Sequence, residues 1–139
     1  MHGKPVLVVG AGPVALRKAR GLLKAGALVR VVAPEVRREF AKLPVRLARR
    51  RFRARDLGGM AMVFAATNDR RVNHRVATGA KRLGIPVNVA DSLPECDFIL
   101  PAHVVSGAVQ VALSTGGRDP RLAVAWKRRI AALLAGSGR

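Results

Sequence analysis

Residues 6–15 read VLVVGAGPVA, and this stretch decides the fold. It begins with apolar, mostly β-branched residues, as a buried strand does. The strand runs directly into Gly10, Gly12 and Ala15, which have the spacing G-x-G-x-x-A. Gly10 allows a tight turn, Gly12 has no Cβ to obstruct a pyrophosphate, and small Ala15 lets the following helix pack on the strand. The stretch therefore predicts a dinucleotide-binding turn at a helix N-terminus, whose unpaired N–H groups face the phosphates.

The residues after this turn fit the same interpretation. Pro13 suits the first turn of a helix, which we expect to run through Lys24 and to end at Ala25-Gly26. Residues 28–33 then form a second buried strand, and Glu35 follows just past its end. A carboxylate there accepts hydrogen bonds from the adenosine ribose and repels a 2′-phosphate, which favours NAD over NADP. The alternative is that Glu35 caps a helix beginning at about the next residue.

Strands and helices continue to alternate. Residues 60–66 are a continuous apolar run with the length of a buried parallel strand, and Thr67-Asn68-Asp69 can cap the amphipathic helix that ends at Gly84. Residues 87–90 form the next short strand. This order predicts an α/β fold, a Rossmann-like doubly wound parallel sheet, whose ligands bind outside the carboxyl ends of the strands. The candidate site residues at that edge are Gly10, Gly12, Pro34, Glu35, Ala66, Thr67 and Asp91.

The pattern changes after Asp91. Residues 98–105 and 108–114 flank Ser106-Gly107 and predict an antiparallel hairpin. Asp119-Pro120 supplies an N-cap and a first-turn proline for a final helix, which we expect to reach about residue 134.

We therefore predict two parts. Residues 1–97 form a dinucleotide-binding domain, and residues 98–139 form a hairpin-plus-helix segment. Within the second part, the run Ser114-Thr115-Gly116-Gly117 precedes a helix, so it either holds an anion or is a plain structural turn.

Charge is the second large feature of the sequence. The formal net charge is +18, so the surface must attract anions. Aromatic residues make up only 4% of the chain and there is no tyrosine, which leaves few stacking platforms for nucleic acid. The densest basic run, residues 46–55, predicts a strand followed by a loop. It is either a solvated edge that discourages aggregation or a contact for a polyanion, with a small molecule favoured over nucleic acid.

Other classes of protein are disfavoured. No apolar run approaches the ~20 residues that span a bilayer, and no secretory pattern opens the chain, so we expect a soluble cytoplasmic protein. Cys96 is the only cysteine, which excludes an intrachain disulfide and predicts an ordinary packed residue. The spacing of histidine, cysteine and carboxylates indicates no permanent metal site. His103 is either a surface residue or one that reaches a ligand or metal.

Four blocks carry a resemblance to a known family. VLVVGAGPVALRKARGLLKAGALVRVVAPE, DLGGMAMVFAATNDRRVN, VNVADSLPECDFILPA and VALSTGGRDPRLA occur in this order and span nearly the whole chain. Together they are similar to the precorrin-2 dehydrogenase / sirohydrochlorin ferrochelatase family of siroheme synthesis. The resemblance implies NAD-dependent oxidation of precorrin-2 to sirohydrochlorin, in some members followed by iron insertion. It also implies a homodimer built through the segment after the Rossmann domain, and the many carboxylates of the tetrapyrrole would explain the basic surface.

The resemblance further implies roles for individual residues. Asp91 would be the acid/base group, because removing a hydride from a reduced tetrapyrrole also requires loss of a proton. The alternative for Asp91 is a loop carboxylate that accepts from backbone N–H groups. The cofactor would contact the pyrophosphate loop at Gly10, Gly12, Pro13 and Val14, the adenosine-side loop at Pro34 and Glu35, and the nicotinamide end at Ala66 and Thr67. The tetrapyrrole would contact Ser114, Gly116, Gly117 and His103.

Some positions depart from the family pattern. Ser106 stands where an arginine is common before Gly107, and Asp119 replaces a usual serine before Pro120. Both changes remove contacts suited to substrate carboxylates. Relatives usually continue into a further helical region, so iron insertion is less supported than NAD binding. Two other functions stay open, a non-catalytic dinucleotide-sensing module and a nucleic-acid-binding protein, the second supported by charge alone.

Overall fold

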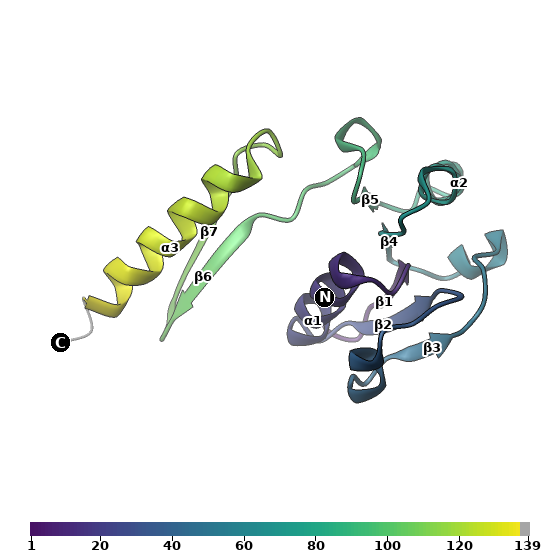
Figure 1. The fold of residues 1–139 in the computed structure, drawn as a ribbon, viewed down its shortest axis with the longest axis horizontal. Helices are drawn as coiled ribbons and strands as arrows, with labels where there is room; N and C mark the ends of the chain where they lie inside the picture. Colours follow the sequence, from purple (N-terminus) through teal and green to yellow (C-terminus); the bar gives the residue numbers. More distant parts are fainter. Residues whose placement is uncertain (137–139) are drawn as a thin grey trace. The chain divides into compact units, whose positions relative to one another are not determined.

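A computed structural model describes residues 1–136, and the chain divides into two compact units, Met1–Phe98 and Ile99–Arg139 (Figure 1). The first unit alternates strands and helices as the sequence predicts. Three short 3₁₀ helices lie between them: η1 (Arg38–Lys42), η2 (Ala54–Leu57) and η3 (Leu93–Glu95). Its regular elements are β1 (Pro5–Val9), α1 (Pro13–Lys24), β2 (Leu28–Val32), β3 (Arg46–Ala48), β4 (Met62–Ala65), α2 (Arg70–Arg82) and β5 (Val87–Val89).

All five strands of the first unit are parallel, in the order β3-β2-β1-β4-β5. Side chains alternate between the two faces of the central strand. Val6 and Val8 of β1 pack in one core cluster with α1, and Leu7 and Val9 pack in another with α2. Both faces of the sheet are therefore buried, which is why its strands are almost continuously apolar. The predicted doubly wound α/β fold is confirmed.

The free edge of β5 is covered by the segment that follows it. The Asp97 N–H donates to the Val87 carbonyl at 2.9 Å, and the Val87 N–H donates to Asp97 Oδ2 at 3.0 Å. Cys96 Sγ accepts from the Val89 N–H at 3.1 Å, so the lone cysteine is a packed residue, as expected. The covering segment satisfies strand groups that an open edge would leave unpaired.

Asn88 links this edge to α1. The Asn88 side chain is 7% exposed; it accepts from Lys18 Nζ at 2.7 Å and donates to the Phe98 carbonyl at 3.0 Å. Burial lowers the pKa of Lys18 below its usual range, with a smaller contribution from neighbouring Arg17. Asn88 therefore holds the last residue of the first unit beside the sheet.

The loop after β2 differs from one of the two predictions made for it. No α-helix begins near residue 36; a 3₁₀ helix starts at Arg38, and its N-cap is Arg37 without a side-chain hydrogen bond. Glu35 therefore does not cap it, and that alternative is wrong. The Arg37 N–H donates to the Ala11 carbonyl at 3.4 Å and Phe40 is fully buried, which holds the segment against the glycine turn.

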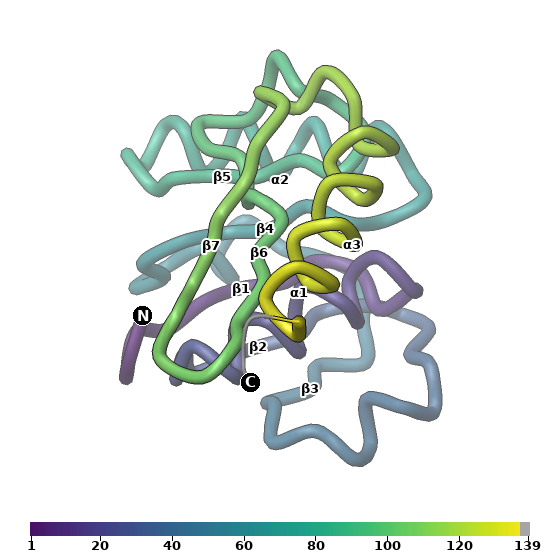
Figure 2. The backbone as a smooth tube through the Cα atoms, turned by 90° about the vertical axis from the view of Figure 1, so that its left-hand side faces the viewer, coloured from purple at the N-terminus to yellow at the C-terminus, as the bar shows by residue number. Residues whose placement is uncertain are grey.

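The second unit is a hairpin with one helix. β6 (Ala102–Ser106) and β7 (Val109–Leu113) pair antiparallel around Gly107, which has φ +59°, and α3 (Pro120–Gly136) runs beside them (Figure 2). The predicted hairpin is confirmed, but its first strand begins at Ala102, not at Phe98. Phe98 instead packs edge-to-face on Phe64, with ring centroids 5.6 Å apart, and Pro101 has no N–H to donate to a strand.

Within residues 1–136, no helix has both the length and the apolar character needed to cross a membrane.

Candidate functional site

The two glycines of the turn after β1 differ in what surrounds them. Gly10 has φ +108°, and a Cβ added there would lie 2.3 Å from the Ala66 carbonyl oxygen. A Cβ added at Gly12 would meet no atom within 4 Å. Gly10 is therefore required by the backbone itself, whereas Gly12 leaves open space in front of the turn.

The start of α1 faces this open space. Gly12 is the N-cap and makes no side-chain capping bond, Pro13 occupies the first turn, and no acidic residue stands there. The first N–H groups of a helix have no partners within the helix and carry partial positive charge. With no carboxylate of the first turn competing for them, they form an anion site. The open face at Gly12 and this helix end fit a dinucleotide pyrophosphate.

A cleft of about 420 Å³ lies at this turn, and we call it the glycine cleft. It brings together six of the eight predicted cofactor residues. Pro13 and Val14, the other two, begin α1 next to Gly12 and are not among its lining residues. The glycine cleft is lined by Gly10, Ala11, Gly12, Ala33, Pro34, Glu35, Val36, Arg37, Ala66, Thr67 and Asn68.

A second cleft, of about 600 Å³, adjoins the first, and we call it the arginine cleft. The two clefts share Pro34, Thr67 and Asn68. Sequence reasoning missed the second cleft because its walls come from the ends of β1, β2 and β4, the loop after β3, and α2. The remaining residues that line it are Val9, Val32, Arg51, Phe52, Asp69, Arg71, Val72 and Arg75.

A buried asparagine fixes the end of β4, which both clefts share. Asn73 is 0% exposed, and its Oδ1 accepts from the Thr67 N–H at 3.0 Å while its Nδ2 donates to the Thr67 carbonyl at 3.0 Å. Asp69 caps α2 as predicted, because its Oδ1 accepts from the Arg71 N–H at 2.9 Å. The role of Asn73 was missed; its only signal is an amide at a position of the helix that faces the sheet.

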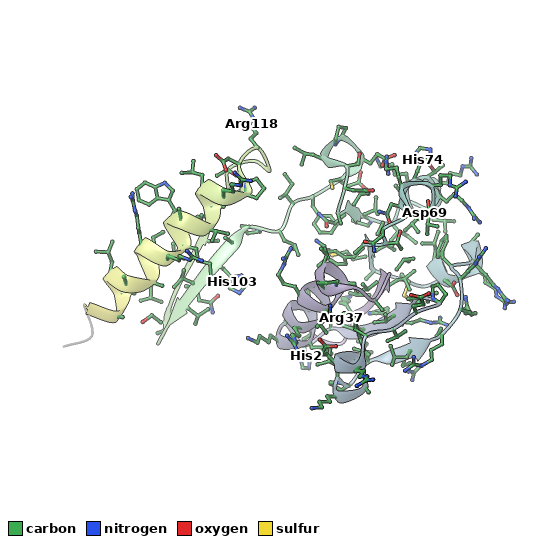
Figure 3. The ribbon with its side chains drawn as sticks, in the orientation of Figure 1. His2, Arg37, Asp69, His74, His103 and Arg118 are labelled. Carbon is green, nitrogen blue, oxygen red and sulfur yellow. The ribbon has the colours of Figure 1, made fainter. Side chains whose placement is uncertain are left out.

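Asp91 follows β5 at the same edge of the sheet but lines neither cleft. Its Oδ1 lies 3.6 Å from Arg70 Nη1, and Arg70 also pairs with Glu95. Glu95 Oε1 lies 2.5 Å from His74 Nδ1, on the helix labelled through His74 in Figure 3. The hydrogen bond from His74, followed by that from Arg70, lowers the pKa of Glu95. The first turn of α2 thereby holds the carboxylates that follow β5.

The four predicted substrate residues belong to the second unit. Ser114 Oγ accepts from the Gly116 N–H at 3.1 Å, and Gly116 and Gly117 have φ values of +64° and +76°. Asp119 Oδ1 accepts from the Leu122 N–H at 2.9 Å and so caps α3, as predicted. His103 lies on β6 with an exposed side chain (Figure 3). Within residues 1–136, no group of three or more His, Cys, Asp or Glu residues is placed to hold a metal ion.

The basic run at residues 46–55 contains one structural arginine. Arg50 donates to both carboxylate oxygens of Asp56, at 2.6 and 2.8 Å, and the Arg53 N–H donates to Asp56 Oδ2 at 2.8 Å. The Asp56 side chain is 1% exposed, and the Arg50 guanidinium holds the pKa of its carboxyl below the usual range. Arg51, in contrast, lines the arginine cleft.

A parallel sheet with a glycine turn and an anion-binding helix end at its carboxyl edge defines a dinucleotide-binding Rossmann domain. The chain belongs to the family described as "Putative NAD(P)-binding", which matches residues 1–102. It is 48% identical over 125 residues to a siroheme synthase of Ectopseudomonas mendocina (strain ymp), a match covering 88% of this chain and 27% of that protein. A siroheme synthase of Methylococcus capsulatus is 47% identical over 130 residues, covering 91% of this chain and 27% of its own length.

The solved structure titled "SirC, precorrin-2 dehydrogenase" is similar with a TM-score of 0.78 and 34% identity. The match covers 95% of this chain and 67% of that chain. The resemblance to the precorrin-2 dehydrogenase family is therefore confirmed, while the chain spans little more than a quarter of the siroheme synthases it matches.

Proposed function

We propose that this chain catalyses the NAD-dependent oxidation of precorrin-2 to sirohydrochlorin in siroheme synthesis. The observation that carries the proposal is the glycine turn with its open face at Gly12, in a chain 34% identical to a structure titled as a precorrin-2 dehydrogenase. The turn supplies a place for the cofactor, and the relative supplies the chemistry.

The cofactor lies along the glycine cleft. Its pyrophosphate faces the N–H groups at the start of α1, and Glu35 accepts from the adenosine ribose. Its nicotinamide end lies toward Ala66 and Thr67, where Asn73 fixes the backbone by two hydrogen bonds to Thr67. When bound, NAD supplies the hydride acceptor.

Asp91 accepts the proton that the reaction releases. Oxidation of precorrin-2 removes one hydride and one proton, so a base must take the proton and pass it to water. Asp91 lies at the carboxyl edge of the sheet, half-exposed to solvent, with Arg70 beside it. Arg70 is a positioning residue, because its guanidinium is shared between Asp91 and Glu95 and so limits where the Asp91 carboxylate lies.

The substrate side of the site involves both the charge and the second unit. The tetrapyrrole carries many carboxylates, which the net charge of +18 attracts. His103, Ser114, Gly116 and Gly117 are the residues we propose to contact it, and the glycine-rich turn presents backbone N–H groups suited to a carboxylate.

We further propose that the chain works as a homodimer in the cytoplasm. No residue of α3 is buried within the described chain, although α3 has 17 residues. Leu122, Val124 and Trp126 on this helix, with Val105 and Val109 on the hairpin, are large apolar side chains left exposed. Such a surface is typical of an interface with a partner, and a second copy supplies the same surface.

Anaerobic mixing of the protein with precorrin-2 and NAD tests the function. NADH absorbance should rise in step with the sirohydrochlorin spectrum, in a one-to-one ratio. The variant Asp91→Asn should bind NAD with unchanged affinity and lose turnover, while the control Glu39→Gln, which alters an exposed carboxylate elsewhere in the first unit, should keep it.

Other outcomes of this assay favour the alternatives. NAD binding without NADH formation would contradict the enzyme and indicate a dinucleotide-sensing module. Binding of DNA or RNA that persists without dinucleotide and falls steeply with salt would indicate a nucleic-acid-binding protein. Equal turnover in Asp91→Asn would remove Asp91 from the mechanism. Iron insertion stays a prediction from the family resemblance, and ferrous iron added after sirohydrochlorin has formed tests it.

A further inference from the structure

The arginine cleft combines two kinds of wall. Its inner side is apolar and includes Phe52 and Val72, next to the ends of β1 and β2. Its rim carries the guanidinium groups of Arg51, Arg71 and Arg75. An apolar floor with an aromatic side chain fits a purine base, and guanidinium groups bind phosphate through paired, charge-assisted hydrogen bonds. The cleft therefore fits the chemistry of a phosphorylated nucleoside.

The positive charge of the rim is not cancelled. Within residues 1–136, neither Arg51 nor Arg75 forms an ion pair with a carboxylate. Asp69 is the only acidic residue in the lining, and it lies 3.5 Å from Arg71 Nε while its Oδ1 already caps α2. Two guanidinium groups thus stand free beside a third that is only partly neutralised.

The arginine cleft also continues the glycine cleft. Pro34, Thr67 and Asn68 line both, so a ligand that starts at the Gly12 turn passes Pro34 directly into the arginine cleft. Glu35 lines only the glycine cleft. Its carboxylate is therefore one negative charge at the boundary, set against three guanidinium groups on the far side.

We propose that the arginine cleft is a phosphate subsite for the adenosine end of the cofactor, so that the chain binds NADP as well as NAD. The base lies on Phe52 and Val72, and the 2′-phosphate lies against Arg51, Arg71 and Arg75. This inference rests on the proposed function for the cofactor, and it revises the preference for NAD that Glu35 alone predicts.

Calorimetric titration of the whole chain with NAD, NADP, 5′-AMP and 2′,5′-ADP tests the subsite. NADP should bind at least as tightly as NAD, and 2′,5′-ADP more tightly than 5′-AMP. The double variant Arg51→Gln/Arg75→Gln should raise the ratio of the NADP to the NAD dissociation constant at least about tenfold, because it removes charge-assisted bonds to phosphate. The control Arg82→Gln changes an arginine at the far end of α2, outside the lining, and should leave this ratio as it is.

The contrary results are as distinct. NADP binding more than about tenfold weaker than NAD in the unaltered chain would overturn the proposal, since the rim is asked to favour phosphate. An equal loss for both cofactors in the double variant would overturn it too, and Arg71→Gln provides a second variant if the double one melts early. Retained discrimination without turnover on either cofactor would leave the subsite in place and contradict the dehydrogenase. Failure to bind either cofactor would contradict both.

Discussion

Gly10 and Gly12 show how one motif serves two purposes at the scale of single residues. The φ of +108° at Gly10, and the carbonyl oxygen of Ala66 that would lie 2.3 Å from its Cβ, make that glycine a condition of the fold. Gly12 has an ordinary φ of −84° and free space in front of it. The sequence motif predicts both glycines, and only the structure separates the one needed by the backbone from the one needed by the ligand.

This separation predicts opposite effects of the same substitution. Gly10→Ala should lower the free energy of unfolding by at least about 1–3 kcal/mol, because alanine is strained at that φ. Gly12→Ala should melt at nearly the temperature of the unaltered chain and bind NAD at least about tenfold more weakly, because its methyl group takes pyrophosphate space. Thermal unfolding followed by circular dichroism and calorimetric NAD titration measure the two. Undiminished NAD binding by Gly12→Ala would show that the pyrophosphate lies elsewhere.

At the scale of elements, hydrophobic patterning predicts what local sequence controls. The strands β1, β2, β4 and β5 and the helices α1 and α2 follow from apolar runs and caps. The start of β6 was misplaced because Phe98 packs on Phe64 in the first unit, a contact between residues far apart in the sequence. The arginine cleft was missed for the same reason, since Arg51 and Arg75 meet only once the sheet is assembled.

The segment between β3 and β4 depends on a buried ion pair, and this predicts how stability varies with pH. The pKa of Asp56 is lowered in the fold, chiefly by its hydrogen bond with Arg50, so the folded state binds this proton less readily than the unfolded state does. The pair therefore stabilises the fold fully above the usual range of an aspartate, about pH 4, and this stabilisation is lost as pH falls toward the lower folded value.

Asp56→Asn should lower the free energy of unfolding at pH 7 by about 1–3 kcal/mol, because it weakens three hydrogen bonds to a buried carboxylate. Urea denaturation between pH 3 and 7 measures the effect. The gap between the variant and the unaltered chain should narrow as pH falls below about 4. A gap of constant size would mean that the charge of Asp56 does not contribute.

At the scale of the whole molecule, the second unit has too little core of its own. α3 has no buried residue in the described chain, and Leu122, Val124 and Trp126 are exposed upon it. The hairpin and helix were predictable from turn and cap residues, but whether α3 is covered is not a local property of the sequence. We attribute its apolar surface to the interface of the proposed homodimer.

Leu122→Glu should therefore shift the protein from dimer to monomer, because it places a charge in an apolar interface. A glutamate in the first turn of a helix favours the helix itself, so α3 should stay intact. The matched control is Leu83→Glu in the first unit, where the leucine is 59% exposed at the end of α2. Sedimentation velocity distinguishes the two states, and a dimer unaffected by Leu122→Glu would place the interface elsewhere.

The central claim, that a dinucleotide binds at the carboxyl edge of the parallel sheet, is tested most directly by NMR. Titration of the isotope-labelled chain with NAD should shift the amide signals of Gly10, Gly12, Val14 and Thr67 first and furthest, because these residues form or adjoin the glycine cleft. Signals from the exposed end of α2, around Arg82, should stay in place. Shifts that avoid the glycine turn, or an unchanged spectrum at millimolar NAD, would contradict the account.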